Sequence, residues 1–451
     1  DYVTMELTNQ RQKVSLSLLK KDAETGKPLE GVVFGLYAQE DIKNAAGEVV
    51  VEKDALIELG TTDEEGKLVF QADLPHGKYY IQEVEHKPGY LPNDEVCSFD
   101  ASYTDQTLEL LAFSEEISNQ PTITEFTKVD LTGGQEIEGA KMQILDQEGK
   151  VVEEWVSKKE AHVVYALAPG EYILHEEQAP TEQGYVRAED VKFVVEETGD
   201  VQKVKMEDDH TKVSISKTDI TDGKEIEGAK LQILDQDGEV VESWTTGEEH
   251  LIEYLPVGTY TLHEEAAVDG YIVANDVEFT VEETGEIQKV KMEDERAMGQ
   301  LVIVKTDTDS KAALEGVEFV LLEKETGKEV GRLKTGKDGK AVSELLPIGT
   351  YENGVFKEPI TYVLKETATL KGYEKTEEEW EIVFTYQNDK TPVIEVVKEI
   401  QNKKIPETPG TVKPGPKTGD DTNWFLPLLA LGVSAGMVAG LLYYRKRHKK
   451  A

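Results

Sequence analysis

Apolar and polar residues alternate in short runs along most of the chain, and these runs predict β-strands with one buried face. In the first run, Val14, Leu16, Leu18 and Lys20 occupy every second position. Successive side chains of a strand point to opposite faces, so residues two apart share a face. The lysine is therefore expected on the inward, apolar side of its strand.

This lysine opens a pattern that occurs four times. A Lys-x-Asp triplet ends each first strand, at Lys20, Lys128, Lys217 and Lys305. An aromatic-apolar-acid ladder follows, which ends at Glu83, Glu176, Glu264 and Glu366. A closing strand then stops on an amide or acid, at Asn119, Asp208, Asp294 and Asn402. Alternation places these last residues on inward faces too, as it does the lysines.

The repeat spacing predicts four domains of ordinary size. Residues 1–11 are expected to form the last strand of a repeat that precedes them. The expected domains, spacer and tail are 12–120, 121–210, 211–297, 298–404, 405–419 and 420–451. Short alternating strands separated by Gly, Pro and Asp turns favour antiparallel β-sandwiches over helical domains. Such domains in tandem would form a rod or stalk.

The charge balance and the single cysteine narrow the class of protein. The chain has 90 acidic and 49 basic residues, a formal net charge of -41. This balance argues against nucleic-acid binding, which needs a positive surface. With Cys97 as the one cysteine, no intrachain disulfide is possible, although small exported β-domains usually carry one. An exported chain of this kind would need another covalent link.

The C-terminus favours export. Residues 424–444 contain no charged residue, and a basic segment follows them. A run of this length predicts a transmembrane helix, and the basic tail places the preceding domains outside the cell. Residues 405–417 contain four prolines and predict an extended spacer.

The recurring Lys, Glu and Asn or Asp predict an intramolecular amide bond. Burial lowers the pKa of an unpaired lysine and raises that of a glutamic acid. A neutral amine can attack the side-chain carbonyl of the acceptor while the glutamic acid hydrogen-bonds the carbonyl oxygen and transfers protons. Ammonia leaves from an Asn acceptor and water from an Asp acceptor. The folded domain would hold the partners within reach of each other.

Each of these residues taken alone is more often an ordinary surface side chain. Their joint recurrence, in the same order and with inward lysine and acceptor, favours the cross-link. Lys21 and Asp209 are the alternatives if a register is shifted by one residue. Tension entering at a first strand would cross the bond to the last strand and bypass the rest of the domain.

Several motifs resemble those of Cna B-type (SpaA-like, prealbumin-like) domains of Gram-positive adhesins and pilins. They are the Lys-x-Asp opening, the Gly-Ala turns Gly139-Ala140 and Gly228-Ala229, the Tyr-x-Leu-x-Glu ladder and a following Gly-Tyr pair. The resemblance covers about 12–404 and implies an all-β fold of four inverse-immunoglobulin sandwiches. It also implies four bonds, each with its glutamate: Lys20–Asn119 with Glu83, Lys128–Asp208 with Glu176, Lys217–Asp294 with Glu264, and Lys305–Asn402 with Glu366.

The tail resembles a sortase sorting signal, in which a pentapeptide precedes the apolar span and basic tail. The family pattern Leu-Pro-x-Thr-Gly implies cleavage between Thr418 and Gly419, and here Gly415 replaces the leucine. A rival pentapeptide begins at Ile405 but has Pro409 where the glycine belongs. The implied partners are sortase and peptidoglycan, with the membrane contacted through 424–444 before cleavage.

These observations predict a secreted, peptidoglycan-anchored stalk of an adhesin, without enzymatic turnover. No arrangement of residues suggests a metal site, a cofactor or a hydrolytic triad, so none is expected. The alternatives are a sortase-polymerised pilin subunit, or the stalk of a surface enzyme whose catalytic domain precedes this sequence. The repeats themselves could also bind a host matrix or cell-surface ligand.

Overall fold

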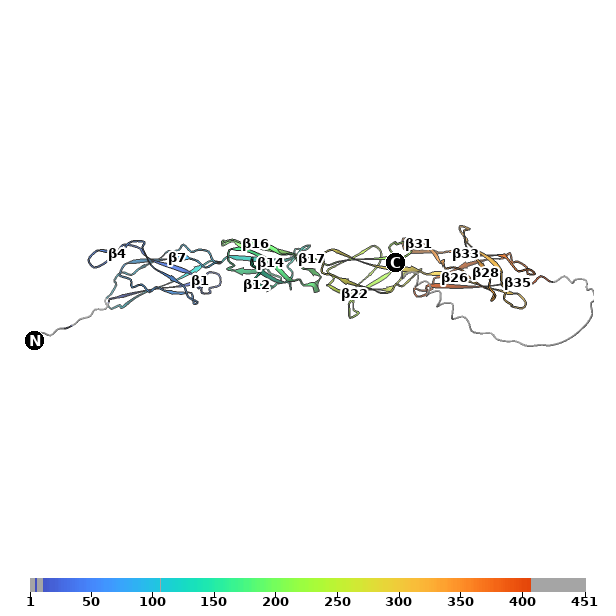
Figure 1. The fold of residues 1–451 in the computed structure, drawn as a ribbon, viewed down its shortest axis with the longest axis horizontal. Helices are drawn as coiled ribbons and strands as arrows, with labels where there is room; N and C mark the ends of the chain where they lie inside the picture. Colours follow the sequence, from blue (N-terminus) through green and yellow to red (C-terminus); the bar gives the residue numbers. More distant parts are fainter. Residues whose placement is uncertain (1–4, 6–10, 106, 407–451) are drawn as a thin grey trace, which may run out of the picture.

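Four β-domains lie in a row in the computed structural model, which describes residues 5, 11–105 and 107–406 (Figure 1). Domain 1 comprises strands β1 to β9, domain 2 β10 to β17, domain 3 β18 to β25, and domain 4 β26 to β35. Within the described residues, the regular structure is β-strand except for one 3-10 turn, η1 (Thr181–Gln183).

Domain 1 contains a three-stranded sheet in the order β6-β1-β9 and a four-stranded sheet in the order β5-β2-β7-β8. A hairpin of β3 and β4 is inserted between β2 and β5. The strands are β1 (Lys13–Asp22), β2 (Val33–Ala38), β3 (Ile42–Lys43), β4 (Val49–Val51), β5 (Leu56–Thr61), β6 (Lys67–Val69), β7 (Lys78–Glu85), β8 (Cys97–Asp100) and β9 (Leu110–Asn119).

Domains 2 and 3 share one topology, with sheets β13-β10-β17-β15 and β12-β11-β14-β16 in domain 2 and their counterparts in domain 3. The strands of domain 2 are β10 (Ile123–Asp130), β11 (Lys141–Leu145), β12 (Val151–Val156), β13 (His162–Tyr165), β14 (Gly170–Gln178), β15 (Tyr185–Val186), β16 (Val191–Val195) and β17 (Val201–His210). Those of domain 3 are β18 (Lys212–Asp219), β19 (Lys230–Leu234), β20 (Val240–Thr245), β21 (His250–Glu253), β22 (Gly258–Ala266), β23 (Tyr271–Ile272), β24 (Val277–Val281) and β25 (Ile287–Arg296).

Domain 4 also contains two sheets. In one sheet β26 pairs with β29, β30 and β35, and in the second sheet the strand order is β28-β27-β33-β34. Its extra hairpin, β31 with β32, lies beside domain 3 (Figure 1). The strands are β26 (Met298–Asp307), β27 (Glu318–Glu323), β28 (Glu329–Lys334), β29 (Lys340–Val342), β30 (Leu346–Pro347), β31 (Gly349–Glu352), β32 (Val355–Pro359), β33 (Thr361–Ala368), β34 (Glu379–Val383) and β35 (Val393–Asn402).

The buried face of a strand is the one that the alternation of apolar and polar residues predicts. In β26, every second residue from Gly299 to Asp307 is buried and those between are half-buried. The apolar residues of the two sheets meet in a separate core for each domain, with Leu16 and Phe34 in domain 1 and Ile303 and Phe319 in domain 4. Burial of these apolar side chains is the main favourable contribution to folding.

The first and last strands of every domain pair in parallel, which differs from the expected antiparallel sandwich. These pairs are β1 with β9, β10 with β17, β18 with β25, and β26 with β35. Alternation fixes the face of a strand but not its direction, so this pairing could not be inferred from it. The chain therefore enters and leaves each domain at opposite ends.

Each of the three joints between domains has a backbone hydrogen bond to the glycine of a Gly-Tyr pair. The carbonyls of Gly89, Gly184 and Gly270 accept bonds of 2.8 Å from the amides of Thr122, Thr211 and Ala297, respectively. Next to the second joint, and within domain 2, Tyr185 and Val186 of β15 pair with the end of β17. The hairpin of domain 4 reaches back to domain 3, where the Tyr351 hydroxyl donates to the Gly270 carbonyl at 2.8 Å.

The predicted tandem β-sandwiches are confirmed. No helix in the described part of the chain is long and apolar enough to span a bilayer. The transmembrane helix predicted at 424–444 lies outside the described residues, as do the spacer from residue 407 onward and most of 1–11.

Candidate cross-link sites

The parallel pairing of first and last strands places each acceptor diagonally opposite its lysine. In domain 1, Lys20 pairs with Ile117 and Asp22 pairs with Asn119. Asn119 is thus two residues beyond the lysine's partner and on the same inward face. The same diagonal relates Lys128 to Asp208, Lys217 to Asp294, and Lys305 to Asn402.

In domain 1, the three predicted residues form a closed, buried cluster. Lys20 Nζ lies 2.5 Å from Asn119 Oδ1 and 2.8 Å from Glu83 Oε2. The Asn119 amide donates to both Glu83 oxygens, at 2.9 and 3.0 Å. The glutamate therefore contacts the amine and the amide at once, the position required of a group that transfers protons between them.

Domain 4 repeats this geometry. Lys305 Nζ lies 2.5 Å from Asn402 Oδ1 and 3.0 Å from Glu366 Oε2. The Asn402 amide nitrogen donates to Glu366 Oε1 and to Thr369 Oγ1, both at 2.7 Å. Thr369 gives this site a contact that the sequence pattern did not predict.

In domains 2 and 3 the acceptor is an aspartate. Lys128 contacts Asp208 and lies 3.0 Å from Glu176, and Lys217 contacts Asp294. The Lys217 to Glu264 distance is likewise 3.0 Å. All eight lysine and acceptor side chains across the four domains are buried.

Burial lowers the pKa of Lys20 and of Lys305, and the hydrogen bond and charge of the adjacent glutamate only partly offset it. The surroundings are apolar: Lys20 Nζ lies 5.3 Å from the ring centre of Phe34, and Lys305 Nζ lies 5.8 Å from that of Phe319. Such surroundings favour the neutral amine, which is the nucleophilic form.

Burial, opposed by the nearby lysine and reinforced by the nearby glutamate, raises the pKa of Asp208 and of Asp294 to about 7. In the described structure, Asp208 Oδ2 and Glu176 Oε1 are buried without a hydrogen-bond partner, and the same holds for the corresponding atoms of domain 3. One proton held between the two carboxyl groups would supply the missing donor. An aspartic acid in its acid form can lose water when an amine attacks.

The shifted-register alternatives lie elsewhere. Lys21 Nζ bonds Glu116 at 2.6 Å on the surface, and Asp209 bonds Lys212 at 2.6 Å. The structure thus brings together all twelve residues that the sequence assigns to cross-links. Thr418 and Gly419, the predicted sortase cleavage site, lie outside the described residues.

Sequence reasoning missed two kinds of supporting contact. Backbone amides hold the glutamates, with Ala188 donating to Glu176 at 2.8 Å and Ala274 to Glu264 at 2.6 Å. The aspartate of each Lys-x-Asp triplet is buried beside the acceptor strand. Its recurrence was a signal, but the pattern did not show what it binds. No cluster of potential metal ligands occurs among the described residues.

The profile of the SpaA family, the prealbumin-like fold domain, matches residues 14–113, 122–210, 211–296 and 299–359. No curated protein matches the chain. Among solved structures, the TIE protein of Bacillus anthracis is 22% identical, with 87% of this chain and 73% of that chain covered and a TM-score of 0.45.

Two pilins also match. The major pilin subunit BcpA of Bacillus cereus is 17% identical, covering 63% of this chain and 100% of that chain at a TM-score of 0.27. The major pilin SpaD of Corynebacterium diphtheriae is 16% identical, covering 88% of this chain and 99% of that chain at a TM-score of 0.22.

Proposed function

Because the chain belongs to the SpaA family of prealbumin-like domains, we propose that it is a surface stalk whose four domains are each closed by an amide bond between first and last strands. The observation that carries the proposal is the buried contact between a lysine amine and an acceptor carbonyl, with a glutamate beside both. It is represented by Lys20, Asn119 and Glu83 and recurs in every domain.

The reaction at each site is a condensation. The neutral lysine nitrogen attacks the side-chain carbonyl carbon, and the glutamic acid donates a proton toward the carbonyl oxygen. The glutamate then passes the amine proton to the departing group. Ammonia leaves from Asn119 and Asn402, and water leaves from Asp208 and Asp294. No oxidant or cofactor enters the balance, and each site reacts once.

The bonds would determine where tension travels. The chain enters a domain at the start of the first strand and leaves at the end of the last, so tension would cross from lysine to acceptor. The residues between would carry little load. In domain 1, Lys20 and Asn119 are 99 positions apart, and a comparable loop would be shielded in each other domain.

We further propose that the chain is a wall-anchored adhesin stalk, cleaved by sortase between Thr418 and Gly419 and attached to peptidoglycan. It rests on the sorting-signal pattern in the sequence. Expression in a Gram-positive host, followed by digestion of the wall, tests it: the chain should be released with wall fragments, and a Thr418→Ala variant should stay in the membrane. Ladders of the chain on denaturing gels would instead indicate a polymerised pilin.

Peptide mapping tests the bonds themselves. Proteolysis of the purified full chain should yield branched peptides that join each lysine to its acceptor. Recovery of the same lysines in linear peptides would refute the proposal.

A further inference from the structure

A backbone contact holds the acceptor residue in place in every domain. The residue after each Lys-x-Asp triplet donates its amide hydrogen to the main-chain carbonyl of the acceptor. The distances are 2.9 Å for Ala23 to Asn119, 2.9 Å for Leu131 to Asp208, 3.1 Å for Ile220 to Asp294 and 3.0 Å for Thr308 to Asn402. This contact forms where the first strand turns away, directly beside the reacting side chains.

The aspartate of the triplet organises that turn. In domain 2, Asp130 pairs with Asp208 across the strands, and its Oδ1 accepts the amides of Thr132 and Gly133 at 2.7 and 2.6 Å. Aspartates are favoured in such turns because the side chain replaces a backbone acceptor. Asp130 thereby fixes the direction in which the Leu131 amide points.

The second oxygen of the aspartate binds a tyrosine. In domains 1 and 3 this tyrosine is the one of the Gly-Tyr pair. The Tyr90 hydroxyl donates to Asp22, and the Tyr271 hydroxyl donates to Asp219, both at 2.8 Å. These contacts lie within one domain. The aspartate, its turn and its tyrosine form what we call the acceptor clamp.

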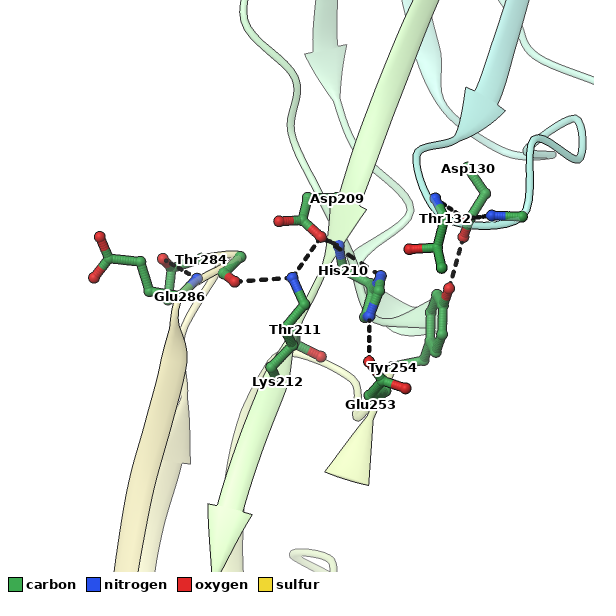
Figure 2. Close-up of polar contacts among 12 residues, drawn as sticks. Asp130, Thr132, Asp209, His210, Thr211, Lys212, Glu253, Tyr254, Thr284 and Glu286 are labelled. Carbon is green, nitrogen blue, oxygen red and sulfur yellow. Dashed lines mark hydrogen bonds and ion pairs between the residues drawn. The ribbon is translucent and has the colours of Figure 1, made fainter. Parts of the chain in front are cut away.

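Domain 2 differs because its clamp includes a residue of the next domain. The hydroxyl of Tyr254, in domain 3, donates to Asp130 Oδ2 at 2.8 Å (Figure 2). Tyr185, the Gly-Tyr residue of domain 2, also interacts with Asp130 and packs edge-on against Tyr254. Burial favours the neutral form of Asp130, but the hydrogen bonds from Gly133, Tyr254 and Thr132 outweigh it and lower its pKa.

Docking of domain 3 is what places Tyr254. Its amide donates to the Thr211 carbonyl within domain 3 at 3.0 Å. Its ring stacks on His210, the last residue of β17 in domain 2, with ring centres 3.9 Å apart (Figure 2). His210 is itself held by Glu253 at 3.1 Å. The Tyr254 hydroxyl can therefore reach Asp130 only when domains 2 and 3 are in contact.

We propose that the aspartate of each Lys-x-Asp triplet positions the acceptor for bond formation, and that Tyr254 completes this positioning for domain 2 from domain 3. Closure of the Lys128–Asp208 bond is then coupled to docking of the neighbouring domain. This inference rests on the proposed amide bonds, and it assigns Tyr254 and Asp130 as positioning residues that do not themselves react.

The test is the rate at which each bond forms in the full chain. The chain is made by cell-free synthesis, samples are quenched in acidic denaturant at intervals, and branched peptides are quantified by mass spectrometry. Tyr254→Phe removes one hydrogen bond to a charged group, so the domain 2 bond should form about tenfold more slowly. The domain 3 bond, Lys217 to Asp294, should form at its normal rate and shows that domain 3 has folded.

Matched variants separate positioning from general stability. Tyr172→Phe removes a hydroxyl that donates to the Ala168 carbonyl of domain 2, outside the clamp, and should leave the rate unchanged. Asp130→Asn keeps an oxygen for the turn and should form the bond faster than Asp130→Ala. Faster hydrogen exchange at the Leu131 amide should accompany the slow variants.

The outcomes distinguish the two proposals. An unchanged domain 2 rate in Tyr254→Phe overturns the coupling, even if the joint loosens and the Thr211 amide, which donates to Gly184 of domain 2, exchanges faster. Equal slowing by Tyr172→Phe also overturns it. Absence of branched peptides from the wild-type chain would instead refute the amide bonds.

Discussion

Lys20 Nζ lies 2.5 Å from Asn119 Oδ1, although the two residues are 99 positions apart in the chain. The contact closes a loop that contains almost the whole of domain 1. An unreacted amine in this buried position loses its hydration, a cost that only excellent partners can offset. The adjacent Glu83 serves both as such a partner and as the means of converting the contact into a bond.

Removing a glutamate should prevent one bond without removing either of its ends. In Glu366→Ala, Lys305 and Asn402 lose the group that contacts both, so the domain 4 bond should not form. The measured mass of this variant should then exceed the mass calculated with all four bonds formed, and the difference should be the mass of one ammonia. The exposed Glu378 provides the control, because Glu378→Ala should still lose that ammonia.

Loss of a bond should release hidden length under force. In Glu264→Ala, the 77 positions between Lys217 and Asp294 become free to extend, by about 250–280 Å at the contour length of a polypeptide. Single-molecule stretching should show one such step in the variant. The wild-type chain should show none from these domains, and regular steps of this size in the wild type would contradict a covalent load path.

The bond should also stabilise each domain thermodynamically. Closing a loop of 80 positions, as between Lys128 and Asp208, contributes about 4–5 kcal/mol by the loop-entropy relation used for disulfides. Native-state hydrogen exchange of the domain 2 core in Glu176→Gln should reveal an opening free energy lowered by at least this amount. Unchanged protection would mean that no loop had been closed in the wild type.

The two acceptor types should respond oppositely to pH. Asp208 and Asp294, whose pKa is raised to about 7 chiefly by burial, keep their proton below that pH and lose it above. Since a carboxylate cannot release water to an amine, bond formation in domains 2 and 3 should slow as the pH rises through about 7. The pKa of Lys20 and of Lys305 is lowered by burial, so more neutral amine forms as the pH rises.

Bond formation in domains 1 and 4, where the acceptor is an uncharged amide, should therefore quicken as the pH rises toward the lowered pKa of the lysines. Timed quenching during cell-free synthesis at several pH values, followed by peptide mapping, measures all four rates in one molecule. Parallel pH profiles for the Asn and Asp sites would show that acceptor ionisation does not limit the reaction.

The joint between domains 2 and 3 should depend on a glycine. Gly184 has a φ of +79°, and a Cβ there would lie 2.4 Å from the backbone of Tyr254. Gly184→Ala should separate the domains and increase the mobility of one relative to the other, as measured by residual dipolar couplings. Gly238 has a similar φ of +81° but open space around it; Gly238→Ala should leave the joint intact, which controls for backbone strain.

The sequence predicted the reacting residues because their positions follow from a local rule. Alternation with period two places Lys20 on the face of Leu16 and Leu18, and the structure buries all three. The same rule placed Asn119 inward. The recurrence of Lys, Glu and Asn or Asp in four repeats favoured a cross-link between them, and the resemblance to Cna B-type domains implied the individual pairs.

The remaining features depend on contacts that no local rule contains. The alternation of apolar and polar residues does not determine the direction of a strand. The parallel pairing of β1 with β9 was therefore not predicted from the sequence. Lys305 and Glu366 are 61 positions apart, against 48 for Lys128 and Glu176, which indicates an insertion in the fourth repeat. This spacing does not show that Tyr351, in the inserted hairpin, contacts Gly270 of domain 3. The sequence pattern likewise did not single out Tyr254, which follows β21 and donates to Asp130 in the structure.

Intact mass spectrometry of the purified chain tests the central claim most directly. With bonds in all four domains, the measured mass should fall below that calculated from the sequence by two ammonias, from Asn119 and Asn402, and two waters, from Asp208 and Asp294. A measured mass equal to the calculated one would show that the four lysines are free, and would contradict the account.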